Sequence, residues 1–394
     1  MTTQIENRIR PLTFIIHFAF LICGIITVLI GQILPVLMKR LELNDAQAGG
    51  LFIAQFSGSI CGTLIFGYTA KRFGFIKTTI FGFISIAAGC LLLNSETWIF
   101  CVLGLFINGI GIGSSLPSVN MLVVVLNPER QASALSVLNF FWGIGAIISQ
   151  PFVAFFGTAT SIFIPTVMLS ILFFLTMLAL FFFRVKTGET NSENKTEEVF
   201  SVKIWTHPLA WLIAAFNFIH VGFESGAGGW LTTYSERFPE GADSLLSATP
   251  AFFLFFVIGR GIAPLFLRVL TENKFLFLSL AVLLTGTIII STAETFTILV
   301  IGASIAGFGT SAIFPANVAR FTKIFGENAM RKSMPLFLSG TLGGASATWL
   351  IGFVSERYEN LQSGIFVLMA SGLILIILQI IIASNSLHRQ INAK

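Results

Sequence analysis

Two stretches decide the fold of this 394-residue chain: Gly109-Ile-Gly-Ile-Gly-Ser-Ser-Leu-Pro117 and Gly307-Phe-Gly-Thr-Ser-Ala-Ile-Phe-Pro315. Each has Gly-x-Gly followed by a proline, and the two lie 198 residues apart. The same offset relates glycines in two further pairs of segments. The related positions are Gly109 and Gly307, Gly111 and Gly309, Pro117 and Pro315, Gly24 and Gly222, and Gly145 and Gly343. One offset that serves several segment pairs indicates an internal repeat of two similar halves.

The composition assigns both halves to a membrane. Apolar residues make up 55% of the chain and charged residues 10%, with 43 Phe and 36 Gly. So few charges cannot cover the surface of a water-soluble fold of this length. A soluble enzyme, a disordered chain and a disulfide-stapled secreted protein are therefore excluded, and a multi-span protein made of helices remains.

Twelve apolar runs are long enough to cross a bilayer, which takes about 20 residues each. They lie near 12–37, 48–70, 76–95, 98–124, 132–156, 161–184, 208–234, 246–268, 274–293, 296–320, 333–355 and 363–384. The sequence therefore predicts an all-α membrane protein of 12 transmembrane helices in two six-helix, pseudo-symmetric bundles. We expect an N-terminal bundle over 1–185, a linker over 186–207 and a C-terminal bundle over 208–394.

The basic residues predict the orientation, because loops on the cytoplasmic side carry an excess of Lys and Arg. With both termini in the cytoplasm, 18 of the 23 basic residues lie on that side. Arg260 lies within a span, and the exceptions on the far side are Lys39, Arg40, Arg237 and Arg357. We expect a multi-pass protein of the cytoplasmic (inner) membrane, with the lipid bilayer as its surroundings. A monomer that binds no nucleic acid is expected, since the basic residues are dispersed.

The repeated glycines and prolines could have either of two structural roles. Glycine lets helices approach closely, and proline removes a backbone hydrogen bond and permits bending. Tight packing explains each residue singly. Their recurrence in both halves favours a hinge or gate role for the set Gly111, Pro117, Gly309 and Pro315.

Three local patterns resemble the major facilitator superfamily. The stretch Gly31–Pro35 with the following Leu43–Gly49 is similar to its opening signature. The stretch Gly67-Tyr-Thr-Ala-Lys-Arg72-Phe-Gly74 resembles its cytoplasmic G-x-x-x-D-R-x-G motif, with Lys71 at the acidic position. The stretch Val221–Tyr234 is similar to the V-G-x-E-x-x-x-G-G-W-x-x-x-Y pattern of the fucose:proton symporter and sugar carrier branch. Gly67, Arg72 and Gly74 join the gating set on this resemblance, and Lys71 puts the usual charge-pair latch in doubt.

The resemblance implies the major facilitator fold and a secondary transporter of a small polar solute, most naturally a sugar. Transport would proceed by alternating access as proton-coupled symport, with Na⁺ as the other possible coupling ion and no further cofactor or metal. A proton-driven exporter of drugs or metabolites is the first alternative, and a non-transporting membrane sensor is the second. The Gly-rich stretches lack the Lys-Ser/Thr of a P-loop, so we expect no enzyme activity of the ATP-driven kind.

Glu224 is the predicted proton-coupling residue. It lies well inside its span, about 16 residues or roughly 24 Å of helix past Pro208. A charge at such a depth costs about 2.5–3.5 kcal/mol on insertion scales, so a retained carboxyl there predicts function. The structural alternative is a carboxyl hydrogen-bonded to a neighbouring helix or paired with Arg260.

Other polar residues inside spans are candidates for proton transfer or substrate binding. His220 lies one turn from Glu224 and Asn217 lies on the same face, so His220 is a second proton-coupling candidate or a satisfied core residue. Arg260 contacts either helix C-terminal carbonyls or substrate. Amide and indole side chains suit hydroxyl groups and sugar faces. The predicted substrate-binding set is Asn217, Asn139, Trp142, Gln55, Asn120, Asn317, Trp230 and Arg260.

Overall fold

The computed structural model describes residues 2–127, 130–182, 202–242, 244, 246–326 and 333–385, and it is helical through most of these ranges. Twelve spans in this part of the chain are long and apolar enough to cross a membrane. Each coincides with a predicted run to within a few residues at most ends, so the predicted fold class is confirmed. The chain divides into two compact units, Met1–Ser192 and Glu193–Lys394. Residues 186–201 of the predicted linker lie outside the described ranges.

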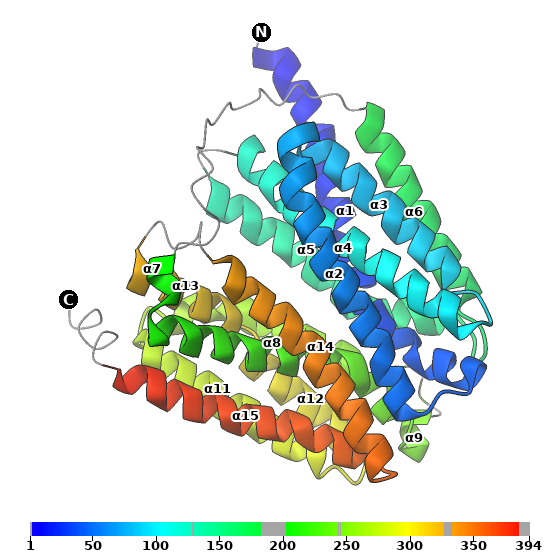
Figure 1. Cartoon of the computed structure of the whole chain (residues 1–394), viewed down its shortest axis with the longest axis vertical. Helices are drawn as coiled ribbons and strands as arrows, with labels where there is room; N and C mark the ends of the chain where they lie inside the picture. The colour runs from blue at the N-terminus through cyan, green and yellow to red at the C-terminus, as the bar shows by residue number, and fades with distance from the viewer. Residues whose placement is uncertain are drawn as a thin grey trace. The chain divides into compact units, whose positions relative to one another are not determined.

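The described residues of unit 1 form six helices, each of which makes one span (Figure 1). Helix α4 lies at its centre, with α2 and α3 packed against it, while α1 packs on α5 and α3 on α6. The helices are α1 (Thr2–Leu41), α2 (Asp45–Phe73), α3 (Phe75–Leu92), α4 (Trp98–Leu126), α5 (Gln131–Phe156) and α6 (Phe163–Phe182).

Unit 2 repeats this arrangement. Helix α12 packs against α10 and α11, α8 packs on α14, and α11 packs on α15. These pairings correspond one by one to those of unit 1. The helices are α7 (Val202–Trp205), α8 (Pro208–Ser235), α9 (Pro239–Ala242), α10 (Thr249–Phe266), α11 (Glu272–Ser291), α12 (Phe296–Thr310), α13 (Ile313–Phe325), α14 (Met334–Arg357) and α15 (Leu361–Ser384).

The glycine pairs of the repeat make the helix contacts. A side-chain carbon at Gly24 would collide with the backbone carbonyl of Trp142 on α5, and one at Gly145 with that of Leu21. In unit 2 a carbon at Gly222 would lie 2.9 Å from the carbonyl oxygen of Gly343. Only glycine permits this approach of two backbones, so the α1–α5 and α8–α14 contacts rest on equivalent pairs.

Local sequence also sets the helix ends. The Asn44 side chain accepts a hydrogen bond from the Gln47 backbone at 2.8 Å, and the Gln47 side chain accepts one from the Asn44 backbone at 3.1 Å. This capping box starts α2. Helix α2 ends at Gly74, whose φ of 81° favours glycine.

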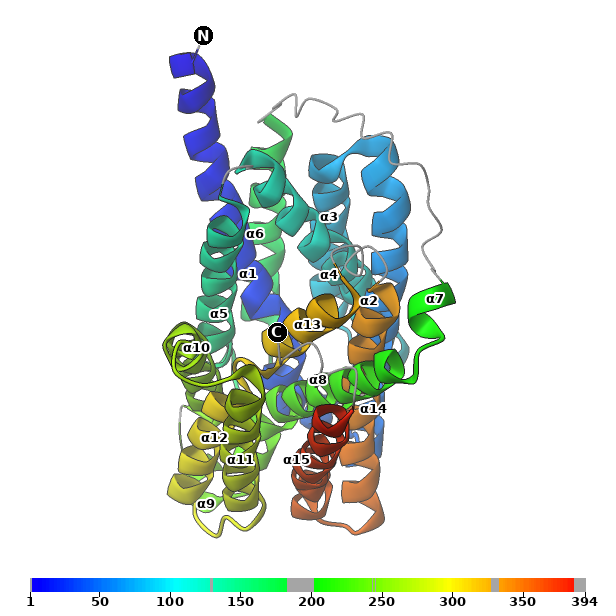
Figure 2. The ribbon, with the colours of Figure 1, turned by 90° about the vertical axis from the view of Figure 1, so that its left-hand side faces the viewer.

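The tenth predicted span differs from the prediction because it is two helices. Helix α12 ends at Thr310, α13 begins at Ile313, and Ser311 and Ala312 form a turn between them (Figure 2). The equivalent span of unit 1, α4, runs unbroken through Pro117. The repeated Gly-x-Gly…Pro motif thus occurs in one continuous helix and at one break.

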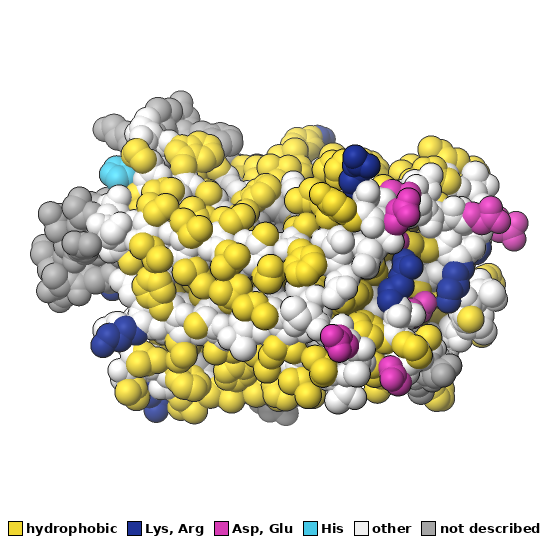
Figure 3. Space-filling view, turned by 90° about the horizontal axis from the view of Figure 1, so that it is seen from below, with side chains coloured by type: hydrophobic (Ala, Val, Ile, Leu, Met, Phe, Trp, Pro, Cys, Tyr) yellow, Lys and Arg dark blue, Asp and Glu magenta, His cyan; other side chains and the backbone are white. Residues whose placement is uncertain are grey.

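Surface residues agree with a bilayer. Large apolar side chains such as Phe14, Phe155, Phe182 and Ile377 are more than half exposed. Figure 3 shows that hydrophobic side chains cover much of the drawn face, with few charged side chains among them. Such a surface is stable against lipid and not against water.

Candidate functional site

The break between α12 and α13 is organised around one backbone carbonyl. Pro315 has no N–H, so it cannot donate to the carbonyl of Ser311 four residues earlier. That carbonyl instead accepts a hydrogen bond from Arg260 of α10, whose Nε lies 3.1 Å from it. Of the two roles expected for Arg260, the structure therefore shows the contact with a helix C-terminal carbonyl.

His220 of α8 contacts the same break. Its Nε2 lies 2.8 Å from the hydroxyl of Thr310, the last residue of α12, and 3.3 Å from the Thr310 carbonyl oxygen. The ring is 1% exposed. Its other nitrogen, Nδ1, is buried with no hydrogen-bond partner among the described residues. Arg260 thus satisfies a backbone carbonyl that a continuous helix would satisfy by itself, and His220 contacts the neighbouring residue of the same break.

Glu224 lies one turn beyond His220 and keeps part of its surface accessible. Its carboxylate and the guanidinium of Arg260 attract each other electrostatically. Arg260 also lies over the ring of Phe256, 4.3 Å from its centroid. Arg260 therefore contacts an aromatic ring on α10 and a carbonyl at the end of α12, and its charge is attracted to an acid on α8.

Unit 1 has a neutral version of this arrangement. Pro117 frees the carbonyl of Gly113, and the hydroxyl of Thr63 on α2 lies 3.3 Å from that oxygen. Adding 198 to Gly113 gives Ser311, so the two carbonyls are equivalent. The hydroxyl of Thr63 contacts the carbonyl of Gly113, and the guanidinium of Arg260 contacts the carbonyl of Ser311.

The helix packing shows that Thr63 and Arg260 are themselves equivalent. Gly109 approaches the carbonyl of Gln55 on α2, and Gly307 approaches that of Phe252 on α10. Gly62 and Gly259 likewise approach the carbonyls of Ile110 and Phe308. Equivalent residues of α2 and α10 are therefore 197 positions apart in the sequence. In the pairs α1 and α8, α4 and α12, and α5 and α14, equivalent residues are 198 positions apart. At 197, Thr63 corresponds to Arg260.

Three other predicted residues of unit 2 lie in its interior. The side-chain amide of Asn217 donates to the Leu336 carbonyl at 2.8 Å, while its Oδ1 has no hydrogen-bond partner among the described residues. The indole of Trp230 donates to the Thr348 carbonyl at 2.9 Å. Asn317 donates to the Ile213 carbonyl at 3.2 Å. Each is at most 1% exposed.

The predicted residues of unit 1 divide into two groups. Gln55 is buried and donates to Asn108 at 3.2 Å. Asn120, Asn139 and Trp142 keep accessible surface. The two asparagines bond to carbonyls of their own helices, and the Trp142 indole lies 3.4 Å from the Thr27 hydroxyl on α1.

The predicted gating residues lie in two places. Gly67, Arg72 and Gly74 are exposed at the end of α2, where Arg72 bonds the hydroxyl of Tyr68 at 2.5 Å. The remaining four gating residues lie along the repeated motif. They are Gly111 and Pro117 in α4, Gly309 in α12 and Pro315 in α13.

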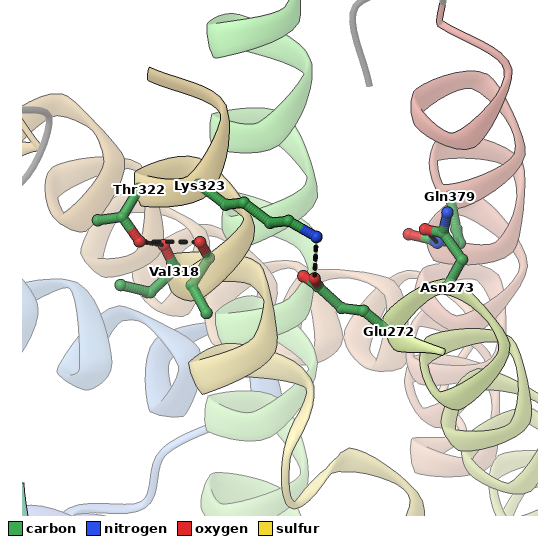
Figure 4. Close-up of polar contacts among 7 residues, drawn as sticks. Glu272, Asn273, Val318, Thr322, Lys323 and Gln379 are labelled. Carbon is green, nitrogen blue, oxygen red and sulfur yellow. Dashed lines mark hydrogen bonds and ion pairs between the residues drawn. The ribbon is translucent and has the colours of Figure 1, made fainter. Parts of the chain in front are cut away.

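Sequence reasoning missed a buried charged cluster in unit 2. It placed Arg320 among the residues of the cytoplasmic side, whereas the structure buries its side chain to 1% exposure in α13. Arg320 donates to Gln379 at 2.6 Å and to Asn317, and it lies over the Phe216 ring. The carboxylate of Glu272 attracts the guanidinium of Arg320. Glu272 also forms an ion pair with Lys323, whose Nζ lies 4.0 Å from its Oε2 (Figure 4). The missed signal is the period of α13, which places Arg320 one turn after Asn317.

Comparison with known proteins assigns the family. Residues 16–334 match the Major Facilitator Superfamily. The chain therefore belongs to this superfamily and is a multi-pass membrane transporter of the secondary active type.

Individual relatives agree with this assignment. The chain is 23% identical to the glucose/mannose transporter GlcP of Bacillus subtilis (strain 168), over 91% of this chain and 92% of GlcP. Its fold is similar to the nucleoside transporter NupG, with a TM-score of 0.77, 13% identity, and coverage of 95% of this chain and 98% of NupG. It is also similar to the E. coli fucose:proton symporter FucP, with a TM-score of 0.62, 17% identity, and coverage of 96% and 100%.

Proposed function

We propose that this protein is a proton-coupled sugar symporter of the cytoplasmic membrane, with both termini in the cytoplasm. The sugar is supported by the full-length similarity to a glucose/mannose transporter. Coupling to protons is supported by the likeness of fold to a fucose:proton symporter and by an acid inside a span. The transporter acts as a monomer in this proposal, and the proton is its only coupling ion.

The observation that carries the proposal is the position of Glu224. Among the described residues it is the acidic side chain that lies well inside a span, and the others lie near helix ends or in loops. A carboxyl group there stays only where it has a role, because its insertion is costly. Glu224 keeps part of its surface accessible, and His220, one turn away with an unpartnered Nδ1, is the second candidate for proton transfer.

Sugar binding is proposed for the candidates that keep accessible surface. In unit 1 these are Asn120, Asn139 and Trp142, which offer two amides and an indole face. Arg260 is partly accessible in unit 2. For the buried candidates we propose a supporting role behind the binding surface, because their polar groups already bond to neighbouring helices. These are Gln55, Asn217, Trp230 and Asn317.

Uptake into proteoliposomes tests the proposal. Wild-type protein should concentrate radiolabelled glucose, mannose or fucose when the outside is acidic, and a nucleoside arm distinguishes the substrate class. Glu224→Gln should abolish accumulation and spare sugar exchange across the membrane. Glu240→Gln is the matched control, since Glu240 is exposed on α9. Accumulation by Glu224→Gln at the wild-type level would exclude Glu224 as the coupling site.

A further inference from the structure

Arg260 has two anionic or electron-rich partners on different helices. Its Nε donates to the Ser311 carbonyl at the end of α12. Glu224 lies one turn beyond His220 on α8, and the His220 ring contacts Thr310, the residue before Ser311, so the acid and the guanidinium approach the same break from two helices. Their opposite charges attract each other. No ion pair within 4.0 Å joins Arg260 to Glu224 among the described residues, whereas the bond to Ser311 is formed. The structure therefore shows the guanidinium hydrogen-bonded to the carbonyl and not joined to the acid by an ion pair within 4.0 Å.

Few other charges face this site. On α8 the titratable neighbour is His220, whose ring bonds Thr310, and Tyr234 lies ten residues beyond Glu224. Helices α12 and α15 carry no charged residue, and those of α14 are at its end, at Glu356 and Arg357. On α11 and α13, Glu272 and Lys323 lie with Arg320, whose guanidinium is over the Phe216 ring, and Lys274 is in the first turn of α11. Among the described residues Glu224 is thus the acid whose charge acts on Arg260.

We propose that Arg260 is a positioning residue that joins the proton site of Glu224 to the break between α12 and α13. When Glu224 is protonated, the guanidinium caps the carbonyl of Ser311, as in the structure. When Glu224 is ionised, it draws the guanidinium away and the carbonyl loses its donor. The inference rests on the proposed function of Glu224, and the step is a shift of hydrogen bonds that follows binding or release of one proton.

A carbonyl that loses its donor in an apolar surrounding costs free energy, so the break must adjust. Pro315 cannot replace the lost bond, because it has no N–H. The α12–α13 turn therefore changes its geometry with the charge of Glu224. In unit 1 the group at the equivalent carbonyl is the hydroxyl of Thr63, which shares its proton with the Ser59 carbonyl of its own helix at 2.9 Å and has no charge to respond to an acid. The proposal predicts that the α12–α13 turn of unit 2 changes its geometry with protonation and that the equivalent part of α4 in unit 1 does not.

Pulsed EPR can measure distances across the α12–α13 break and across the equivalent part of α4 in the whole protein. Spin labels at Ile301→Cys and Ala319→Cys span the break, and both positions are exposed. Labels at Leu103→Cys and Met121→Cys are the matched pair on α4, exactly 198 residues earlier and also exposed. A continuous helix would separate either pair by about 27 Å. Cys61→Ala removes the one native cysteine that is not buried. Infrared titration of the Glu224 carboxyl, identified by its absence in Glu224→Gln, reports protonation separately.

The wild-type distance across the α12–α13 break should shift between acidic and alkaline pH along the infrared titration of Glu224, while the α4 distance stays constant. Glu224→Gln should hold the acidic distance at every pH. Arg260→Gln should abolish the shift while Glu224 still titrates. An unchanged shift in Arg260→Gln, or no wild-type shift while Glu224 titrates, would overturn the inference and leave the proposed function standing. A Glu224 that does not titrate would overturn both.

Discussion

Helix α4 and the helix pair α12–α13 are equivalent parts of the repeat, yet one is continuous and the other is broken. Both contain Gly-x-Gly and a proline, at Pro117 and Pro315, and each proline frees the carbonyl four residues before it. The proline alone therefore does not break the helix. The two parts differ in what meets the freed carbonyl: the hydroxyl of Thr63 in unit 1 and the guanidinium of Arg260 in unit 2.

The same contrast extends through the interiors of the two units. At an offset of 198, His220 corresponds to Ile22, Glu224 to Ile26 and Arg320 to Leu122. Unit 1 thus has aliphatic side chains where unit 2 has ionisable ones. The contrast agrees with the proposed function, in which unit 2 takes up the proton, and the continuous central helix lies in unit 1.

The largest effect is expected for Arg320→Leu, which gives unit 2 the leucine that unit 1 has at the equivalent position. Arg320→Leu leaves Gln379 and Asn317 without their donor and Glu272 without its buried cation. Removing one member of a buried charged cluster costs about 3–5 kcal/mol. Thermal unfolding in detergent should show this loss, and Lys323→Leu, at the exposed side of the cluster, should cost much less. Equal effects of the two substitutions would contradict the assignment of Arg320 as the centre.

Arg260→Thr, which copies Thr63 into unit 2, should have the next largest effect. A hydrogen bond to a charged group contributes about 1.5–3 kcal/mol, so stability should fall by that amount. Hydrogen exchange should also change at the amides of residues 311–314 and stay constant in α4. If exchange changed equally in both helices, the guanidinium would not be the local determinant of the break.

Trp230→Phe and Trp142→Phe should separate packing from binding. Trp230 is fully buried and bonds Thr348, so its replacement should lower stability by about 1 kcal/mol with a small change in sugar KM. Trp142 is partly accessible, so its replacement should raise the KM for sugar several-fold and leave stability nearly unchanged. The reverse pattern would show that Trp230 is the residue in contact with sugar.

The smallest effect is expected for Thr63→Val in unit 1. The bond from Thr63 to Gly113 is 3.3 Å long, and bonds between membrane helices contribute about 0.6 kcal/mol on average. Unfolding should shift by no more than this, with proton-coupled uptake unchanged. A loss of coupling in Thr63→Val would show that the joint in unit 1 also takes part in transport.

The sequence was sufficient to predict the twelve spans and the repeat, because both depend on local hydropathy and on glycines at a fixed offset. Gly24 and Gly145 illustrate this, since each meets a backbone in the helix that the repeat predicts. The break after Thr310 was not predicted. Its motif is shared with the continuous α4, so the motif alone holds no information about continuity.

The site was predicted only in part for the same reason. Glu224 and His220 stand out as polar residues in an apolar helix, and the structure places His220 and Arg260 at one break, with Glu224 one turn beyond His220. The role of Thr63 and the burial of Arg320 depend on contacts between helices. The one-residue change of offset between α2 and α10 hides the equivalence of Thr63 and Arg260 in the sequence, and packing reveals it.

Proton movement during sugar entry tests the central claim most directly. Proteoliposomes are placed in weakly buffered medium with no gradient, and glucose or another transported sugar is added outside while external pH is recorded. The account predicts that wild-type protein makes the medium more alkaline as sugar and proton enter together, and that Glu224→Gln admits sugar with no pH change. A pH change of wild-type size in Glu224→Gln would contradict it.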